Sequence, residues 1–403
     1  MKRSLRLPFV AAAAVLVAAA CGGGGSTSSS SNGGATAPGV TSDTIQIGTT
    51  NAETGNVSGP ATLTKAGAQA VFDKVNASGG IYGRKIKDDV LDDGYTAPKA
   101  VANARTFVDQ PVFAVFGGYG TVPAQSIVPI LQEAKVPYLF PYQGNPYPGD
   151  KYVFLVMPLY RNQTVAVIKD ALQKYGKGTV YALVGKTADT AQTLQDAQQA
   201  TDQAGGRWLG YDEVNQGTTD YTPYVLRMKQ AHPDFVLVST TPTDCARYVT
   251  AMVAQGAIPA KRILGLQTLA TESFINAVPP EASNVVFAPG PTAAPSSKLA
   301  ADCIATVHKY QPGTQVTMET LWGCGTAQLF VYALQKVGAN LTRDGLIKTL
   351  EGMHQVDAAP VLTPISFSSS NRVGETTMYQ FTSSNKQLVS GGTMPIANVN
   401  VGA

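Results

Sequence analysis

The chain has 403 residues, of which 44% are hydrophobic, and its formal net charge is +3 at pH 7. This small charge and the lack of a basic stripe argue against a nucleic-acid partner. The roughly 360 residues that follow residue 42 exceed what one hydrophobic core usually supports, so two lobes are expected.

The first 20 residues have the pattern of a secretory signal. The cations Lys2, Arg3 and Arg6 precede an apolar run at 7–20, which is shorter than the about 20 apolar residues of a membrane span. These three cations account for the whole net charge, so the remainder of the chain is neutral overall. Residues 1–20 are therefore expected to be a signal peptide.

Cys21 follows three alanines, and residues 22–34 are almost all Gly, Ser and Thr. The pattern resembles the lipobox of bacterial lipoproteins, in which the cysteine becomes the lipidated first residue. Residues 21–42 would then form a lipidated cysteine and a flexible linker with a reach on the order of 25 Å. We expect a lipid-anchored protein on the outer face of the cytoplasmic membrane. The alternative is an ordinary secreted protein in which Cys21 is incidental.

Three further cysteines, Cys245, Cys303 and Cys324, are an odd number for an oxidising compartment. Cys303 and Cys324 fall on consecutive predicted helices, so this pair is expected to form a disulfide. Cys245 would then be a buried free thiol. None of them has the spacing of a zinc site, and no metal is expected.

From residue 44 onward, short apolar runs alternate with longer amphipathic ones. The short runs predict strands at 45–48, 85–91, 113–116 and 138–140, and the amphipathic runs predict helices at 60–76, 98–108 and 124–134. This alternation predicts a mostly parallel sheet with helices on both faces.

A second series of the same kind follows. It predicts strands at 180–184, 208–211, 235–238 and 263–266, and helices at 165–175, 194–204, 224–231 and 244–255. Helices at 299–310, 318–337 and 346–353 and a hairpin of strands 365–367 and 377–381 complete the chain. The expected fold class is α/β, with two doubly wound Rossmann-like lobes joined by hinge crossings. Such sheets bind ligands at the carboxyl ends of their strands, here in the cleft between the lobes.

No motif for catalysis stands out. The three histidines, His232, His308 and His354, do not have the spacing of a metal site. The Gly-Lys-Thr run at 185–187 lacks the upstream glycine of a phosphate loop, because Val180 occupies that position. We therefore expect no enzymatic activity, no catalytic residue and no cofactor. A secreted hydrolase remains an alternative, and it would need a nucleophile and a base in the cleft.

Several runs of the first lobe are specific enough to indicate a family. Residues 75–84 read Val-Asn-Ala-Ser-Gly-Gly-Ile-Tyr-Gly-Arg, after Glu-Thr-Gly at 53–55 and before Asp-Asp-Gly-Tyr at 92–95. The chain resembles the branched-chain amino-acid-binding-protein family, the type I periplasmic ligand-binding proteins, over most of residues 44–390. The resemblance implies a protein that delivers a small-molecule solute to a membrane ABC permease. A ligand sensor of the same fold that reports to a membrane receptor is an alternative, and a monomer is expected.

The resemblance also implies how the chain is divided. Lobe 1 would comprise residues 43–161 and 289–358, and lobe 2 would comprise residues 162–288 and 359–403. Solute would bind between the lobes and favour their closed arrangement, with hinge strands absorbing the motion.

Ligand-binding residues are carried over from the family's motifs. They are Gly118, Tyr119, Gly120 and Thr121 in one loop of lobe 1, Tyr142 and Gln143 in the next, and Asp189, Thr241 and Gln267 in lobe 2. The family's threonine in lobe 1 appears as Gly144, its Tyr-Gly turn as Asp189-Thr190, and its acidic partner for the ligand ammonium as Gln267.

These departures alter the expected ligand, because a buried ammonium without a counter-charge costs several kcal/mol. We therefore expect a solute without an α-ammonium group: an amide, an aromatic or other organic acid, or a larger neutral metabolite. An amino-acid binder with a rearranged site is the alternative.

Overall fold

The computed structural model describes residues 37–145, 147, 151–187 and 189–396, all of which belong to one compact unit. The expected signal peptide and Cys21 lie outside the described residues, as does most of the expected linker. Within the described ranges, no helix has the length and apolar character needed to cross a membrane.

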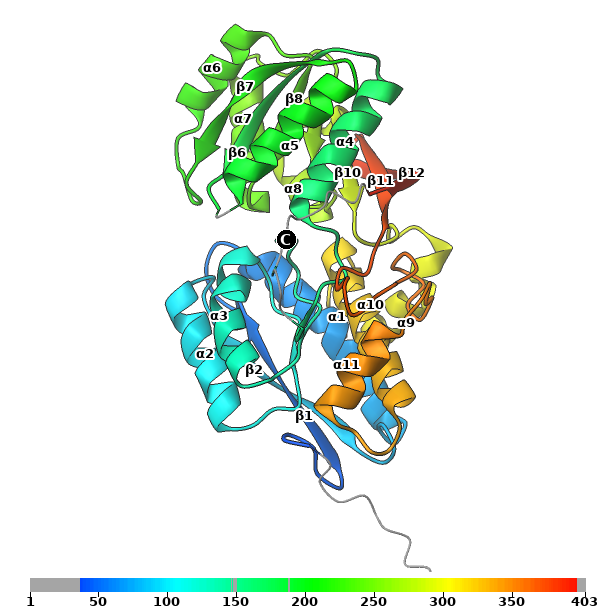
Figure 1. Cartoon of the computed structure of the whole chain (residues 1–403). Coiled ribbons are helices and arrows are strands. Elements are labelled where there is room, and N and C mark those ends of the chain that lie inside the picture. The colour runs from blue at the N-terminus through cyan, green and yellow to red at the C-terminus, as the bar shows by residue number, and fades with distance from the viewer. Residues whose placement is uncertain (1–36, 146, 148–150, 188, 397–403) are drawn as a thin grey trace, which may run out of the picture. The chain divides into compact units, whose positions relative to one another are not determined.

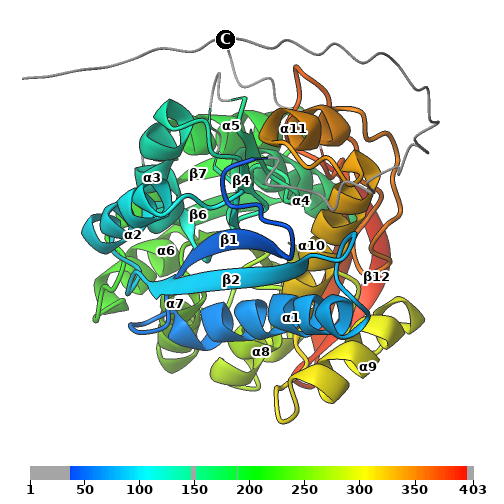
Figure 2. The ribbon, with the colours of Figure 1, turned by 90° about the horizontal axis from the view of Figure 1, so that it is seen from below.

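Lobe 1 is the part of the chain built on a five-stranded parallel sheet with the strand order β2-β1-β3-β4-β5. Its strands are β1 (Thr44–Asn51), β2 (Lys85–Asp92), β3 (Val115–Phe116), β4 (Tyr138–Leu139) and β5 (Val153–Phe154). Helices α1 (Ser58–Ala77), α10 (Met318–Val337) and α11 (Arg343–Glu351) share one hydrophobic core on this sheet. Helices α2 (Ala97–Asp109) and α3 (Thr121–Glu133) form a second core on its other face (Figures 1 and 2).

Lobe 2 is built on a seven-stranded sheet with the order β12-β11-β10-β9-β8-β6-β7. Its parallel strands are β6 (Thr179–Gly185), β7 (Arg207–Val214), β8 (Phe235–Ser239), β9 (Arg262–Gly265) and β10 (Val286–Gly290). Helices α4 (Tyr160–Lys174) and α5 (Thr190–Gln203) contribute to one core, and α6 (Thr222–Ala231), α7 (Pro242–Ala254) and α8 (Glu272–Ala277) contribute to the other. The predicted α/β fold with two lobes is confirmed.

Three chain segments run between the lobes and are hydrogen-bonded to one another. Gly374 N donates to Leu155 O at 2.8 Å, and Glu375 N donates to Val156 O at 3.0 Å. The third segment contains Ala293, whose N donates to the carbonyl of Val361, on the same segment as Gly374 and Glu375, at 2.7 Å. The connection between the lobes is therefore a bundle of extended strands, which can twist while keeping these bonds.

The predicted C-terminal hairpin is wrong in its pairing. Strand β11 (Thr377–Ser384) pairs antiparallel with β12 (Gln387–Pro395), whereas residues 365–367 form only isolated bridges through Ile365. The turn falls at Asn385 and Lys386, whose φ angles are 49° and 58°. Two-residue hairpin loops require such left-handed angles, and they usually signal themselves by a glycine that is missing here.

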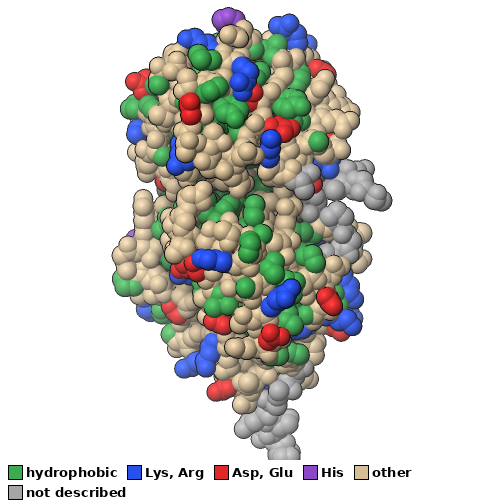
Figure 3. Space-filling view, turned by 90° about the vertical axis from the view of Figure 1, so that its left-hand side faces the viewer, with side chains coloured by type: hydrophobic (Ala, Val, Ile, Leu, Met, Phe, Trp, Pro, Cys, Tyr) green, Lys and Arg blue, Asp and Glu red, His purple; other side chains and the backbone are tan. Residues whose placement is uncertain are grey.

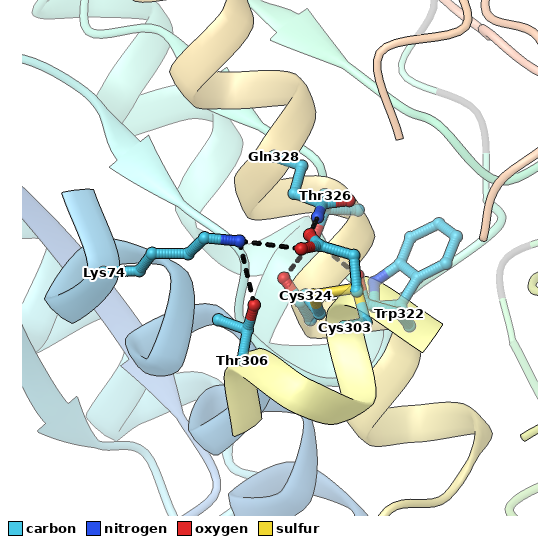
Figure 4. The surroundings of a disulfide bond; sticks show 9 residues. Lys74, Cys303, Thr306, Trp322, Cys324, Thr326 and Gln328 are labelled. Atoms are coloured by element: carbon cyan, nitrogen blue, oxygen red, sulfur yellow. Dashed lines mark hydrogen bonds and ion pairs between the residues drawn. A yellow bond between two sulfur atoms is a disulfide. The ribbon is translucent and has the colours of Figure 1, made fainter. Parts of the chain in front are cut away.

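A disulfide joins Cys303 of α9 (Ala301–Tyr310) to Cys324 of α10, with a Cα–Cα distance of 5.9 Å, and Cys245 is a buried free thiol. Figure 4 shows the polar contacts beside the disulfide. Lys74 Nζ of α1 donates to Asp302 Oδ1 at 2.8 Å, and Gln328 Nε2 of α10 donates to Asp302 Oδ2 at 2.9 Å. Covalent and polar contacts thus hold three helices of lobe 1 together.

Replacing Cys303 and Cys324 by serine should lower the free energy of unfolding by about 3 kcal/mol, the value expected for releasing a loop of this length in the unfolded chain. The sequence separation of the pair is 21 residues. Chemical unfolding with and without a reductant measures the effect. Reductant should destabilise the natural chain and leave the double variant unchanged. Equal sensitivity of both proteins to reductant would contradict the prediction.

Candidate functional site

A cavity lies between the two lobes, with about 770 Å³ of empty volume that includes space open to solvent. It is placed at the carboxyl ends of β3 and β4 in lobe 1 and of β6, β8 and β9 in lobe 2. Figure 3 shows the groove between the lobes from one side, with hydrophobic side chains gathered along its lobe 1 border. The loops that follow these strands supply most of the lining.

Among the described residues, none that lines the cavity has a charged side chain. The four tyrosines Tyr95, Tyr119, Tyr142 and Tyr160 provide most of its aromatic surface. The polar remainder consists of hydroxyls and amides: Thr121, Asn145, Thr187, Thr190, Thr193, Gln216, Ser239, Thr240, Thr241, Gln267 and Thr268. The cavity therefore offers hydrogen bonds and aromatic contact but no ion pair.

Four helices begin at the cavity wall: α3 at Thr121, α4 at Tyr160, α5 at Thr190 and α7 next to Thr241. Helix N-termini carry partial positive charge and unpaired N–H groups, so they favour anions. The first turns of α3, α4 and α5 contain no acidic residue. The acid of the α7 first turn, Asp244, accepts hydrogen bonds from the Thr241 hydroxyl and from Gly217 N, both at 2.9 Å.

Two aromatic residues of lobe 1 form a stack at the cavity wall. The Tyr119 and Tyr142 ring centroids are 4.8 Å apart with an interplanar angle of 10°, and the Trp322 ring meets Tyr142 edge-on at 5.4 Å. Backbone bonds align the two loops, since Gly120 N donates to Tyr142 O and Tyr142 N donates to Gly118 O. Burial raises the pKa of both tyrosines well above the ordinary value, so their hydroxyls stay neutral.

Glycines permit the close approach of these loops. Gly118 and Gly120 have φ angles of 87° and 96°, and a Cβ at Gly120 would lie 2.1 Å from the Tyr95 ring. A Cβ at Gly144 would lie 2.7 Å from the Tyr160 ring. Glycine at this position gives Tyr160 the room to enter the cavity wall.

Gln267 is fully buried, and neither of its side-chain polar atoms has a hydrogen-bond partner among the described residues. Its backbone is fixed, because Gln267 N donates to Gln163 Oε1 at 3.2 Å. The Asn145 amide nitrogen and the hydroxyls of Thr240 and Thr268 are likewise buried and unpaired within the described part of the chain. Buried polar groups are normally hydrogen-bonded, so these atoms are candidates for contacts with a ligand or with water.

Six of the nine residues proposed from the sequence line the cavity: Tyr119, Gly120, Thr121, Tyr142, Thr241 and Gln267. The lining does not include Gly118, Gln143 or Asp189. Gln143 shapes its own loop instead, since its Oε1 accepts a hydrogen bond from Asn145 N at 2.6 Å. Asp189 precedes α5, and burial raises the pKa of its carboxyl while the Arg161 charge opposes that shift.

The sequence reasoning missed other lining residues. Tyr95 belongs to the Asp-Asp-Gly-Tyr run that indicated the family, and Tyr160 is the first residue of α4. The threonines at 187, 190 and 193 lie at the start of α5, directly after β6. Their position at the carboxyl end of a strand was the available signal, but single hydroxyl residues are common in such loops.

Two α/β lobes whose strand ends face a cavity between them are the arrangement of the type I periplasmic binding fold. The chain matches the profile of the family described as "Periplasmic binding protein" over residues 44–387. It therefore belongs to the periplasmic binding protein family, and the resemblance to the branched-chain amino-acid-binding proteins is confirmed.

Among curated relatives, the chain is 25% identical over 213 residues to the leucine-, isoleucine-, valine-, threonine-, and alanine-binding protein of Pseudomonas aeruginosa. That match covers 48% of this chain and 53% of the relative, so the chain spans about half of the relative's length. It is 24% identical over 315 residues to Leu/Ile/Val-binding protein homolog 2 of Brucella abortus, with 74% and 83% of the two chains covered. These relatives are solute-binding proteins rather than enzymes.

Solved structures share the fold at lower identity. The fatty acid ABC transporter substrate-binding protein of Thermomonospora curvata has a TM-score of 0.79 at 21% identity, with 91% of this chain and 96% of that chain covered. A solute-binding protein of Rhodopseudomonas palustris BisB5 in complex with 3,4-dihydroxy benzoic acid has a TM-score of 0.75 at 19% identity, covering 88% and 98%. These structures share the overall fold of this chain.

Proposed function

We propose that this protein is an extracytoplasmic lipoprotein that captures a small organic acid without an α-ammonium group and delivers it to an ABC permease. The observation that carries the proposal is the electrostatic character of the cavity. Four helices begin at its wall, of which α3 and α4 have no acid at the N-cap or in the first turn, and no lining side chain is acidic within the described residues.

A carboxylate fits this environment, whereas an ammonium does not. The N-terminus of α3 and the Thr121 hydroxyl border the cavity, and both can donate hydrogen bonds to a carboxylate. An α-ammonium would be buried without a counter-charge, because no lining side chain among the described residues is acidic, and the resemblance to the family implies that Gln267 takes the place of its acid. That burial costs several kcal/mol, enough to outweigh the gain of aliphatic contact.

The tyrosine surface favours an acid with a planar or extended apolar body. Tyr119 lines the cavity and has Tyr142 stacked against one face of its ring, so a planar ligand can extend the stack. Relatives of the same fold are named for a fatty acid and for a complex with 3,4-dihydroxy benzoic acid, both of which lack an α-ammonium. These names support the ligand class, although they describe the other proteins.

Lipid attachment at Cys21 would hold the protein at the membrane, and the glycine-rich linker would let it reach a permease. Tethering raises the effective concentration of the binding protein at its membrane partner without any new contact. Processing at Cys21 is tested by mass spectrometry of the protein from its native membrane. Diacylglyceryl cysteine at the N-terminus is expected, and an unmodified N-terminus elsewhere would contradict the anchor.

The ligand class is tested with the mature chain carrying Cys21→Ser and Trp208→Phe, which leaves Trp322 as the reporter beside Tyr142. Benzoate, 3,4-dihydroxybenzoate and octanoate are compared with leucine, isoleucine and valine. An acid that binds, present at a concentration of 100 times its dissociation constant, should raise the free energy of unfolding by about 2.7 kcal/mol. It should also change the fluorescence of Trp322. Stabilisation by the amino acids at micromolar concentration, with none by the acids, would reject the proposal.

A further inference from the structure

The two lobes give the cavity chemically different walls. Lobe 1 supplies the stacked rings of Tyr119 and Tyr142. Lobe 2 supplies hydroxyl and amide side chains from the loops that follow β6, β8 and β9, among them Thr240 and Gln267. A ligand that packs against the rings of lobe 1 therefore faces polar groups of lobe 2.

Two of these polar groups are buried without a partner in the described part of the chain. Gln267 is fully buried, and neither its Oε1 nor its Nε2 makes a hydrogen bond there. The Thr240 hydroxyl is buried and unpaired in the same way. Even if the neighbouring Tyr160 hydroxyl turned to bond one atom of the Gln267 carboxamide, the other atom would remain. Buried polar atoms normally have a partner, so these atoms call for one from outside the chain.

The sheet of lobe 2 brings Thr240 and Gln267 to the same level of the wall. Val238 of β8 pairs with Gly265 of β9 in parallel register. Thr240 and Gln267 each follow two residues later, so they leave neighbouring strands side by side. A Cβ at Gly185, the last residue of β6, would lie 2.7 Å from Thr240 Oγ1, so this hydroxyl also borders a third strand end.

The Gln267 backbone is fixed on both sides of its side chain. Its N–H donates to Gln163 Oε1 at 3.2 Å, and its carbonyl accepts a hydrogen bond from Ala270 N at 3.1 Å. Gln163 is itself fixed, because its Nε2 donates to Pro158 O at 2.8 Å. The carboxamide is thus held at the wall before any ligand arrives, which lowers the entropy cost of binding.

The free atoms indicate the chemistry of the partner. A carboxamide offers both an acceptor and donors, and a threonine hydroxyl offers both. A carboxylate only accepts and an ammonium only donates, whereas a neutral hydroxyl does both. We propose that the solute carries a neutral hydroxyl in addition to its carboxylate, and that Gln267 and Thr240 bind this hydroxyl. The inference rests on the proposed function for the carboxylate, and it makes Gln267 the residue that distinguishes hydroxylated acids from plain ones.

The test uses the mature chain with Cys21→Ser and Trp208→Phe, titrated at pH 7 by Trp322 fluorescence. The probes are 3- and 4-hydroxybenzoate and their counterparts 3- and 4-methylbenzoate, in which a methyl group of similar size replaces the hydroxyl. At least one hydroxy acid should bind about tenfold or more tightly than its methyl counterpart, because the methyl group leaves the buried atoms unpaired. Gln267→Met, which keeps an unbranched side chain of similar size, should abolish this preference, and Thr240→Val should reduce it.

Gln203→Met is the matched control, since it makes the same change at an exposed position near the end of α5. It should keep the preference of the natural chain. Equal affinity of the natural chain for the hydroxy and methyl acids, or an unchanged preference in Gln267→Met, overturns the inference and leaves the proposed function standing.

Two further measurements separate the inference from the proposed function. Without ligand, Gln267→Met should melt at or above the temperature of the natural chain, because it removes buried atoms that have no partner. A lower melting temperature would mean that Gln267 has a structural partner, and it would overturn the inference. The corresponding hydroxy and methyl benzamides are titrated as uncharged probes. If the amides show the hydroxyl preference and no acid binds, the acid class fails while the hydroxyl site stands; if no probe binds, both fail.

Discussion

Replacing Gln267 by glutamate should reverse the ligand preference of the cavity. Gln267 is fully buried with both polar atoms unpaired among the described residues, so a carboxylate of the same size would face the ligand directly. Affinity for an organic acid should fall by at least about 100-fold, since an uncompensated buried charge costs about 3 kcal/mol or more. Leucine would gain the counter-charge that its ammonium lacks in the natural chain.

Fluorescence titration with benzoate and with leucine measures both effects. Gln203→Glu is the control, because it adds the same charge at an exposed position near the end of α5. It should leave both dissociation constants unchanged. If Gln267→Glu binds benzoate as tightly as the natural chain does, Gln267 is not in contact with the ligand and the ligand argument fails.

A single methyl group added at Gly323 should destabilise the fold by about 3 kcal/mol. Helices α1 and α10 cross with their backbones in contact, because a Cβ at Gly323 would lie 1.8 Å from the carbonyl oxygen of Thr64. The reciprocal contact is as tight, with a Cβ at Gly67 only 2.0 Å from the carbonyl oxygen of Thr320. A backbone carbonyl cannot rotate away as a side chain can, so the helices must separate to admit alanine.

Urea unfolding of Gly323→Ala and Gly67→Ala measures the effect. The matched control is Gly59→Ala, in the first turn of α1, where an added Cβ meets nothing within 4 Å. The free energy of unfolding of that variant should be unchanged or higher by up to about 1 kcal/mol, because alanine has a greater helix propensity than glycine. Equal stability of Gly323→Ala and Gly59→Ala would show that the two helices are farther apart than described.

The sequence pattern predicted the long helices and the buried parallel strands, because their periodicity reflects which face is buried. It missed β5, which has two residues, and α8, which has six, since so few residues carry no period. It also missed β10 and paired the final hairpin wrongly. The turn at Asn385 and Lys386 lacks the glycine by which such turns are recognised.

The sequence predicted only part of the site. Loops of lobe 1 were placed by the family motif, and Tyr119, Thr121 and Tyr142 do line the cavity. Tyr95 and Tyr160 were not singled out, because a tyrosine in a loop or at the first position of a helix is ordinary. Only the tertiary packing brings them to the cavity, and nothing in the local sequence reports that.

Helix α10 contributes side chains to hydrophobic cores of both lobes. The Met318 side chain belongs to a core of lobe 2, whereas Leu321 and the residues after it belong to the core of lobe 1. The first turn of α10 must therefore remain fixed to lobe 2 when the lobes separate. A second contact between the lobes, at the rim of the cavity, joins the Thr243 hydroxyl to Asn56 O at 3.2 Å and can break without disturbing either core. Substitutions at that rim should alter how fast solute enters and leaves, whereas substitutions in the first turn of α10 should alter how often the two lobes come together at all.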